Sequence, residues 1–165
     1  MKHLFKIFLL VSALGVSACT NPGRFDNGGA AGADTLNGAV SDPASPAYFQ
    51  QVVGDRILFL VNQSTVNESA RAVLVTQARW MLQNPEYTAI IEGHADERGT
   101  REYNLALGAR RANSVQEFLI SQGISASRLR TVTFGKERPV EICSAESCYN
   151  QNRRAVTVLA AGGLS

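Results

Sequence analysis

Residues 89–115 read AIIEGHADERGTREYNLALGARRANSV, and three kinds of sequence follow one another in this stretch. The run at 89–91 is apolar and belongs to a segment at 87–94 that is rich in β-formers, as expected of a buried strand. A loop crowded with charges comes next, and residues 102–122 then carry apolar positions at spacings of three and four up to Gly123. The stretch predicts a strand, a polar loop and a long amphipathic helix.

The rest of the folded region continues this alternation of strand and helix. Apolar runs at 56–61, 129–134 and 154–159 predict three more strands. A helix capped by Asn67 is expected to end at Asn84-Pro85, with apolar residues on one face at Ala70, Leu74, Ala78 and Met81. The pattern predicts an α/β (α+β) two-layer sandwich, a sheet with helices packed on it and at least one parallel crossover.

Length and charge limit the possible classes of protein. The chain has 165 residues, 45% of them apolar, and a formal net charge of +2. This is enough for one globular domain with a core and accessory segments. The near-neutral balance gives no electrostatic reason to expect nucleic acid as a partner.

The first 18 residues have the pattern of a secretory signal peptide. Lysines at positions 2 and 6 precede an apolar stretch at 7–16, which is short for a membrane span, and small residues follow. The sequence at 16–19, VSAC, resembles a bacterial lipobox, which implies cleavage before Cys19 and acylation of that residue with chains such as palmitate. Thr20 stands where an inner-membrane retention signal would have aspartate, which favours the outer membrane. The alternative is an ordinary cleavage site with Cys19 as a spare thiol.

Residues 21–46 contain almost no large apolar side chain and are rich in Gly, Ala, Asn, Asp and Ser. Such a segment cannot bury enough surface to fold, and it is interpreted as a flexible tether. We therefore expect a signal peptide at 1–18, a lipidated N-terminus and tether at 19–46, and a folded domain at 47–165.

Arg111 lies inside the apolar stripe of the long helix, among Leu107, Gly108, Ala112, Val115, Phe118 and Leu119. A guanidinium at such a position must be paired or must line a pocket, because an unpaired buried charge is costly. The expected partner is an acid at the end of a neighbouring strand, with Glu92, Asp96 and Glu97 as candidates. Arg110 is rotated about 100° away and is expected to face solvent. From these residues alone, a structural salt bridge and a ligand site are both open.

The stretch EGHADERGTREYNLALGARRANSV resembles the signature of the OmpA-like peptidoglycan-binding domain, and within it the peptidoglycan-associated lipoproteins. The helix matches the family pattern N-x-x-L-[SG]-x-x-R-A-x-x-V from Asn104 to Val115, and FGKERP at 134–139 and NRRAV at 152–156 are also similar to the family. The resemblance covers residues 53–159. It implies a βαβαββ fold with a mixed four-stranded sheet and helices on one face.

The resemblance also implies a site for the diaminopimelate side chain of peptidoglycan. Asp96 would meet the ligand's ammonium and Arg111 its carboxylate. The expected peptidoglycan-binding residues are Asp96, Arg111, His94, Asn104, Gly93 and Phe59. At the first strand the family reads F-D-F-D-S where this chain has FLVNQS at 59–64, so Leu60 cannot supply a polar side chain, although a backbone group could serve. Asn62 is expected to keep a turn-forming role.

Other kinds of chemistry are less well supported by the residues. His94 and Asp96 form H-x-D, but the only other histidine is His3 in the signal peptide, so no metal site is expected. A cell-wall hydrolase using a pair of acids is a second hypothesis. Against it, the acids lie among arginines that would keep them ionised, and no activated nucleophile accompanies them. We expect no catalytic residue, no cofactor and no enzyme activity.

Cys143 and Cys148 flank the sequence SAES, and in an oxidising compartment they are expected to form a disulfide. A pair of free thiols is the alternative.

The resemblance implies an outer-membrane lipoprotein of the Tol-Pal system that acts in cell division. Its partners would be peptidoglycan, the membrane, the propeller protein TolB and, as a further candidate, TolA. A lipoprotein tether outside the Tol system would share the same site.

Overall fold

The computed structural model describes residues 40–161, and four strands in this part form one mixed sheet. The strands are β1 (Arg56–Leu58), β2 (Tyr87–His94), β3 (Leu129–Gly135) and β4 (Arg154–Ala161), in the order β1-β4-β2-β3. β2 and β3 are parallel, whereas β4 runs antiparallel to both β1 and β2. The mixed four-stranded sheet with a parallel crossover that the sequence predicts is confirmed.

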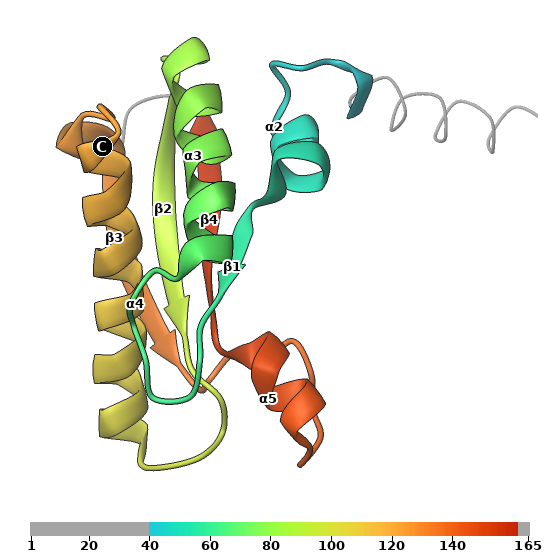
Figure 1. Ribbon diagram of the computed structural model, residues 1–165, viewed down its shortest axis with the longest axis vertical. Coiled ribbons are helices and arrows are strands. Elements are labelled where there is room, and N and C mark those ends of the chain that lie inside the picture. Colours follow the sequence, from blue (N-terminus) through green and yellow to red (C-terminus); the bar gives the residue numbers. More distant parts are fainter. Residues whose placement is uncertain (1–39, 162–165) are drawn as a thin grey trace, which may run out of the picture. The chain divides into compact units, whose positions relative to one another are not determined.

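The two long helices, α3 (Glu68–Gln83) and α4 (Arg101–Ser121), cover the same face of the sheet (Figure 1). Asn67 caps α3 as predicted, because its Oδ1 accepts a hydrogen bond from the N–H of Ala70 at 2.9 Å. Thr100 caps α4 by accepting from the N–H of Tyr103 at 3.2 Å. The prediction of helices on one face is confirmed.

The buried faces of both helices follow the predicted apolar periodicity. On α3 the buried positions include Ala70, Leu74, Ala78 and Met81, and on α4 they include Leu107, Gly108, Arg111, Ala112, Val115 and Leu119. Arg111 is 0% exposed, whereas Arg110 beside it faces solvent. The helix therefore places Arg111 in the core region and Arg110 in solvent.

Four short helical elements escape the sequence-based prediction. A short helix α2 (Pro46–Tyr48) runs into a π-helical stretch, Phe49–Gly54, before β1. Phe49 in this stretch is fully buried and packs on Trp80 of α3, with 4.9 Å between ring centroids. A second short helix, α5 (Glu146–Asn152), lies between β3 and β4, and a 3₁₀ turn (Ala126–Arg128) precedes β3.

The N-terminal predictions fall largely outside the described residues. Residues 1–39 are not described, and they include the predicted signal peptide at 1–18, Cys19 and most of the predicted tether at 19–46. At the end of the tether, the carbonyl of Pro43 accepts a hydrogen bond from Trp80 Nε1 at 2.7 Å. In residues 40–161 no helix combines the length and apolar character needed to cross a bilayer.

Strand β1 is shorter than predicted, because it ends at Leu58 instead of continuing to residue 61. The N–H of Phe59 still donates to the carbonyl of Arg153 at 2.8 Å. The carbonyl of Leu60 instead accepts from Arg111 Nη2 at 3.2 Å and from the N–H of Gln63 at 3.1 Å. The chain leaves the sheet at this point because a side chain of α4 competes for its backbone, and Asn62 turns it with a φ of 56°.

Helix α4 lies unusually close to β2 where Gly93 faces Gly108. A Cβ atom on Gly93 would lie 1.8 Å from the carbonyl oxygen of Gly108, and a Cβ on Gly108 would lie 2.4 Å from Thr133 Oγ1. Both distances are shorter than the contacts that real Cβ atoms make with non-bonded atoms. The two glycines thus set how near α4 approaches the sheet, and Arg111 lies one turn further along the same face.

We predict that Gly93→Ala lowers the free energy of unfolding by about 3 kcal/mol, because the added methyl group must push the α4 backbone away. Urea denaturation measures this change. The control is Asn113→Ala on the exposed face of α4, which should shift the free energy of unfolding by no more than about 0.5 kcal/mol. Equal effects of the two substitutions would contradict the close contact.

Candidate functional site

Asp96 lies in the loop between β2 and α4, residues 95–100, here called the site loop. Its Oδ1 accepts from the backbone N–H of Arg98 at 3.1 Å, and its Oδ2 accepts from Arg98 Nη2 at 2.9 Å and from Arg153 Nη1 at 3.0 Å. The Arg153 side chain is only 2% exposed, whereas that of Arg98 is 44% exposed. The carboxylate therefore has one buried arginine and one solvent-accessible arginine as partners.

The surroundings of Asp96 favour its ionised form. Burial of the carboxyl raises its pKa, but the hydrogen bonds from the side chains of Arg98 and Arg153, with the backbone bond from Arg98, outweigh that effect. The pKa of Asp96 consequently lies below its usual value. Near neutral pH the Asp96 carboxylate is therefore ionised and paired with these two arginines.

Arg111 is held by three backbone carbonyls and not by an acid. Its Nε donates to Gln63 at 2.8 Å, its Nη1 to His94 at 2.7 Å and its Nη2 to Leu60 at 3.2 Å. The expected pairing of Arg111 with Glu92, Asp96 or Glu97 is therefore wrong as a direct contact. A main-chain oxygen satisfies a guanidinium as well as a carboxylate does, and no side chain marks such oxygens in the sequence.

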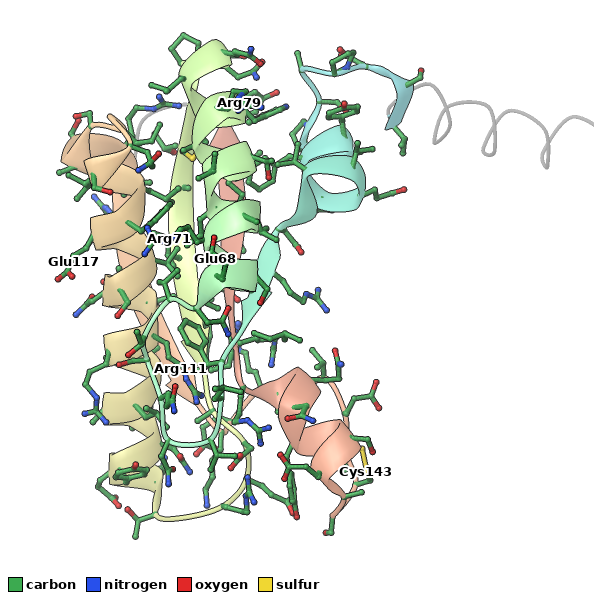
Figure 2. The ribbon with its side chains drawn as sticks, in the orientation of Figure 1. Glu68, Arg71, Arg79, Arg111, Glu117 and Cys143 are labelled. Atoms are coloured by element: carbon green, nitrogen blue, oxygen red, sulfur yellow. A yellow bond between two sulfur atoms is a disulfide. The ribbon has the colours of Figure 1, made fainter. Side chains whose placement is uncertain are left out.

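The charge of Arg111 nevertheless remains part of the site. Burial lowers its pKa to about 10, and the negative charge of Asp96 opposes that shift. The guanidinium lies over the ring of Phe59, 5.2 Å from its centroid. Figure 2 shows Arg111 between α4 and the loop that follows β1. It stays protonated at neutral pH, so its positive charge interacts electrostatically with the Asp96 carboxylate.

Asn104 contributes by holding the site loop. Its side chain is buried, and its Nδ2 donates to the carbonyl of Arg98 at 2.9 Å. Gly99 allows the loop to turn there, because its φ of +92° is a conformation that other residues avoid. Lys136 donates from Nζ to the carbonyl of Gly99 at 2.8 Å. Asn104 thus fixes the loop backbone.

Gly93 and His94 reach the site through their backbones. Gly93 packs on α4, and the carbonyl of His94 accepts from Arg111. The His94 imidazole stacks on the ring of Phe134, with centroids 5.6 Å apart, and among the described residues its two nitrogens have no hydrogen-bond partner. The sequence suggests a side chain that lines the site, whereas in the structure the imidazole packs on Phe134 and its Nε2 lies 3.5 Å from Glu92 Oε2.

A hollow of about 330 Å³ opens beside the carboxylate. It is lined by Val61, Asn62, Asp96, Arg98, Gly99 and Tyr103, and is here called the Asp96 hollow. Asn62 accepts from the Tyr103 hydroxyl at 3.3 Å. The carbonyl of Leu60 accepts from Arg111, while 57% of the residue stays exposed, and whether its backbone also contacts a ligand stays a prediction. Asp96 lies at the wall of this hollow with 7% of its surface exposed, and Arg98 lines the hollow beside it.

Sequence reasoning missed the contribution of Arg153. This residue joins three segments: Nη1 binds Asp96, Nη2 binds Glu146 of α5, and Nε donates to the carbonyl of Phe59 at 3.2 Å. The available signal was the pair of arginines in NRRAV, Arg153 just before β4 and Arg154 at its start. Consecutive residues of an extended chain point in opposite directions, so each arginine needs its own set of partners.

The cysteine prediction is confirmed, because Cys143 forms a disulfide with Cys148 in the first turn of α5. Cys19 lies outside the described residues, so its acylation stays a prediction. In the part of the chain that the structure covers, no three His, Cys, Asp or Glu side chains come together as metal ligands.

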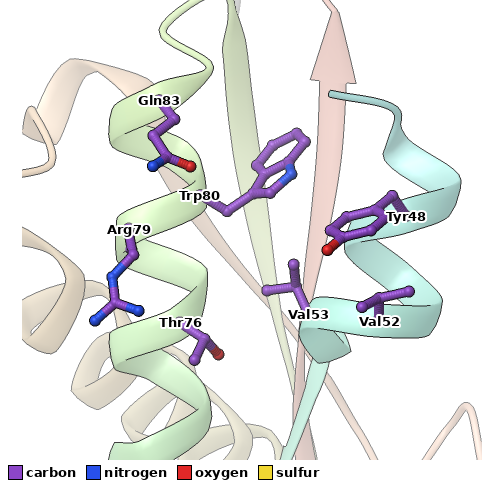
Figure 3. A pocket seen from close by; sticks show the side chains of 7 residues that line it. All are labelled: Tyr48, Val52, Val53, Thr76, Arg79, Trp80 and Gln83. Carbon is purple, nitrogen blue, oxygen red and sulfur yellow. The ribbon is translucent and has the colours of Figure 1, made fainter. Parts of the chain in front are cut away.

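A second hollow of about 330 Å³ lies between the π-helical stretch and α3 (Figure 3). It is lined by Tyr48, Val52, Val53, Thr76, Arg79, Trp80 and Gln83. This lining contains a cation and no acid, so it does not suit an ammonium group. The Asp96 hollow is the better candidate for a ligand that carries both charges.

We predict that His94 makes the stability of the protein depend on pH. Burial first, and then the charges of Arg154, Arg138 and Arg56, lower its pKa to about 4. An unfolded chain, with a histidine pKa of about 6.5, binds more protons between these two values, so stability falls as pH drops from about 6.5 towards 4. The loss is at most about 1.4 kcal/mol per pH unit.

Urea denaturation of the wild type and His94→Phe at pH 7.5, 6.0 and 5.0 measures this dependence. The substitution keeps an aromatic ring on Phe134 and removes the titrating group. The variant should lose less stability than the wild type over this range, since other groups titrate equally in both. Parallel curves would show that His94 is protonated equally in the folded and unfolded chains.

Comparison with known proteins identifies the family of this fold. The model of the OmpA family matches residues 58–153. The peptidoglycan-associated lipoprotein of Mesorhizobium japonicum is 47% identical over 155 residues, which are 93% of this chain and 90% of that protein. The corresponding protein of Agrobacterium fabrum is 47% identical over 159 residues, 96% of this chain and 89% of that protein.

Solved structures show the same fold. The crystal structure of the peptidoglycan-associated lipoprotein from Burkholderia pseudomallei aligns with a TM-score of 0.65 and 34% identity, covering 74% of this chain and 99% of that one. The C-terminal domain of Helicobacter pylori MotB aligns with a TM-score of 0.61 at 17% identity, over 65% of this chain and 84% of that one, which shows a shared fold alone. This chain therefore belongs to the OmpA family and, within it, to the peptidoglycan-associated lipoproteins.

Proposed function

We propose that this protein is a lipid-anchored, non-catalytic tether that binds the diaminopimelate-containing stem peptide of peptidoglycan and so connects the outer membrane with the cell wall. The observation that carries the proposal is the ionised Asp96 carboxylate, which lines a hollow beside the charges of Arg98 and Arg111. The name of the relatives, peptidoglycan-associated lipoprotein, supports the same ligand and a membrane anchor.

The side chain of diaminopimelate ends in an ammonium and a carboxylate on one carbon atom. Asp96 would accept the ammonium in a charge-assisted hydrogen bond. The ligand carboxylate would then lie in the positive field of Arg98 and Arg111. A peptide with only one of these two groups would make only one of the two interactions, either with Asp96 or with the two arginines.

Arg111 has two N–H groups left that could donate hydrogen bonds to the ligand. A guanidinium has five N–H groups, and the three described bonds leave one on each terminal nitrogen. Because Arg111 is fully buried, a direct contact requires the groups that cover it to move aside. Without that movement, Arg111 acts through its charge and through the carbonyls that it holds in place.

The membrane anchor would be Cys19, followed by a tether of residues 19–46. Treated as a flexible coil, such a tether has a root-mean-square reach of about 30 Å. This length lets an anchored domain leave the surface of the outer membrane and face the cell wall in the periplasm.

A role in the Tol-Pal system would add TolB as a partner, and TolA as a further candidate, with a function in envelope constriction during division. A tether outside the Tol system would use the same site. Capture of purified TolB by the immobilised protein supports the Tol role, and absence of capture favours the alternative.

Binding is also distinguished from hydrolysis by one assay. Purified protein is incubated with cell-wall sacculi and then sedimented. Sedimentation of the protein without release of soluble muropeptides supports a binding protein. Release of muropeptides would support a hydrolase.

For the ligand, we predict that a muropeptide with meso-diaminopimelate binds and that the same peptide with lysine binds far more weakly, as measured by calorimetry. Lysine keeps the ammonium and lacks the carboxylate, so the positive charge behind Asp96 would stay uncompensated. Asp96→Asn should weaken binding by about 2–5 kcal/mol. Arg110→Ala is the control, and its exposed side chain should matter little. Equal binding of both peptides would contradict the assignment.

For the anchor, we predict that Cys19→Ser abolishes labelling of the protein with radioactive palmitate and releases it from the membrane fraction, because the acyl chains supply the membrane affinity. Cell fractionation and fluorography measure both effects. Unchanged retention in the outer membrane would show that another segment or a partner holds the protein there.

A further inference from the structure

The segment closed by the Cys143–Cys148 disulfide lies against the site loop. The two cysteines are five positions apart, and α5 begins between them. Figure 2 shows Cys143 on this segment next to α5. Ser144 Oγ donates to Glu97 Oε1 at 3.3 Å, and the Tyr149 hydroxyl donates to the same oxygen at 3.0 Å. The disulfide loop therefore contacts the residue next to Asp96.

Arg98 and Arg153 connect the same segment to Asp96 itself. The Arg98 guanidinium lies over the ring of Tyr149, 4.5 Å from its centroid, and its Nη1 is 3.5 Å from Glu146 Oε2. Arg153 Nη2 donates to Glu146 Oε1 at 2.6 Å and to Asn150 Oδ1. Both arginines that hold the Asp96 carboxylate are thus held in turn by α5.

The two arginines differ in what a ligand could do to them. Arg98 lines the Asp96 hollow and is largely accessible, so an incoming ammonium can take over its bond to Asp96 Oδ2. Displaced from Asp96, Arg98 keeps Glu146 and Tyr149 as partners. Arg153 is buried and has four described hydrogen-bond acceptors, so it stays on the carboxylate throughout.

Helix α5 is poorly equipped to hold this arrangement alone. It has seven residues, which is too short for stability in isolation, and its N-cap Ala145 makes no side-chain capping bond. Only Asn152 among its residues is buried. A covalent link across its first turn reduces the conformations open to the segment. The position of Glu146 and Asn150 then depends on that link.

We propose that Arg153 is the positioning residue that fixes the Asp96 carboxylate towards its ligand, and that the Cys143–Cys148 loop holds Arg153 in place through α5. The inference rests on the proposed binding of an ammonium-bearing peptide at Asp96. The affinity of the site would then depend on the hydrogen bond from Arg153 Nη1 to Asp96 Oδ2 and on the oxidation state of the two cysteines.

The first test uses Arg153→Lys. This substitution keeps the positive charge and removes the planar guanidinium that bonds Asp96 and Glu146 at once. Neutral substitutions are less informative, because removing a cation near Asp96 could by itself strengthen ammonium binding. Calorimetry of the purified full chain with the meso-diaminopimelate muropeptide should show binding weakened at least about tenfold, which corresponds to about 1.4 kcal/mol. The Asp96 carboxyl carbon signal in NMR spectra of the ligand-free variant should also shift.

Arg154→Lys is the matched control. Arg154 is also buried, but it donates to the carbonyls of Asn152 and Arg138 and to no acid. A similar loss of thermal stability is expected in both variants, with less than about a twofold change in the dissociation constant for Arg154→Lys. Equal dissociation constants for the wild type and Arg153→Lys would overturn the positioning role.

The second test covers the case in which Arg153→Lys fails to fold. Cys143→Ser combined with Cys148→Ser, and separately the wild-type chain under a thiol reductant, should weaken binding several-fold and shift the NMR signals of Asp96 and Arg98. Unchanged binding and unchanged signals would overturn the role of the disulfide loop. If the wild-type chain itself fails to bind the muropeptide, the proposed function falls and this inference falls with it.

Discussion

The buried guanidinium of Arg111 is the constraint on which the rest of the site depends. Placing this charge in an apolar helix stripe would cost several kcal/mol without hydrogen-bond partners. The chain satisfies it with the carbonyls of Leu60 and Gln63, in the connection after β1, and of His94 at the end of β2. Each of these carbonyls is consequently withdrawn from the sheet or from solvent. The early end of β1, the turn at Asn62 and the end of β2 all follow from that requirement.

The close approach of α4 to β2 makes this arrangement geometrically possible. Gly93 and Gly108 let the two backbones nearly touch, and Arg111 follows Gly108 by one helical turn. A larger residue at either glycine would carry Arg111 away from the carbonyls that it must reach. The same approach brings the start of α4 against the site loop, where Asn104 holds the carbonyl of Arg98. The packing of two small residues thus fixes a charged site several residues away.

The sequence predicts those parts of the fold that have a strong periodic signal. The burial of Arg111 and the exposure of Arg110 follow from helical spacing, and the disulfide of Cys143 follows from compartment and cysteine count. The partners of Arg111 could not be predicted, because backbone carbonyls have no residue-type signature. Helix α5 escaped because only Asn152 of its seven residues is buried, so it shows no apolar period. Because α5 was not predicted, the hydrogen bond from Arg153 to Asp96 was not predicted either.

The central claim is that Asp96 is the receptor for the ammonium of the ligand, with Arg111 and Arg153 fixed behind it. A crystal structure of the protein with a meso-diaminopimelate muropeptide tests it most directly. We expect the ligand ammonium about 3 Å from the Asp96 carboxylate, with Arg98 displaced and Arg153 still in place. A muropeptide bound in the hollow lined by Tyr48 and Trp80, or an Asp96 that keeps Arg98 and contacts no ligand atom, would contradict it.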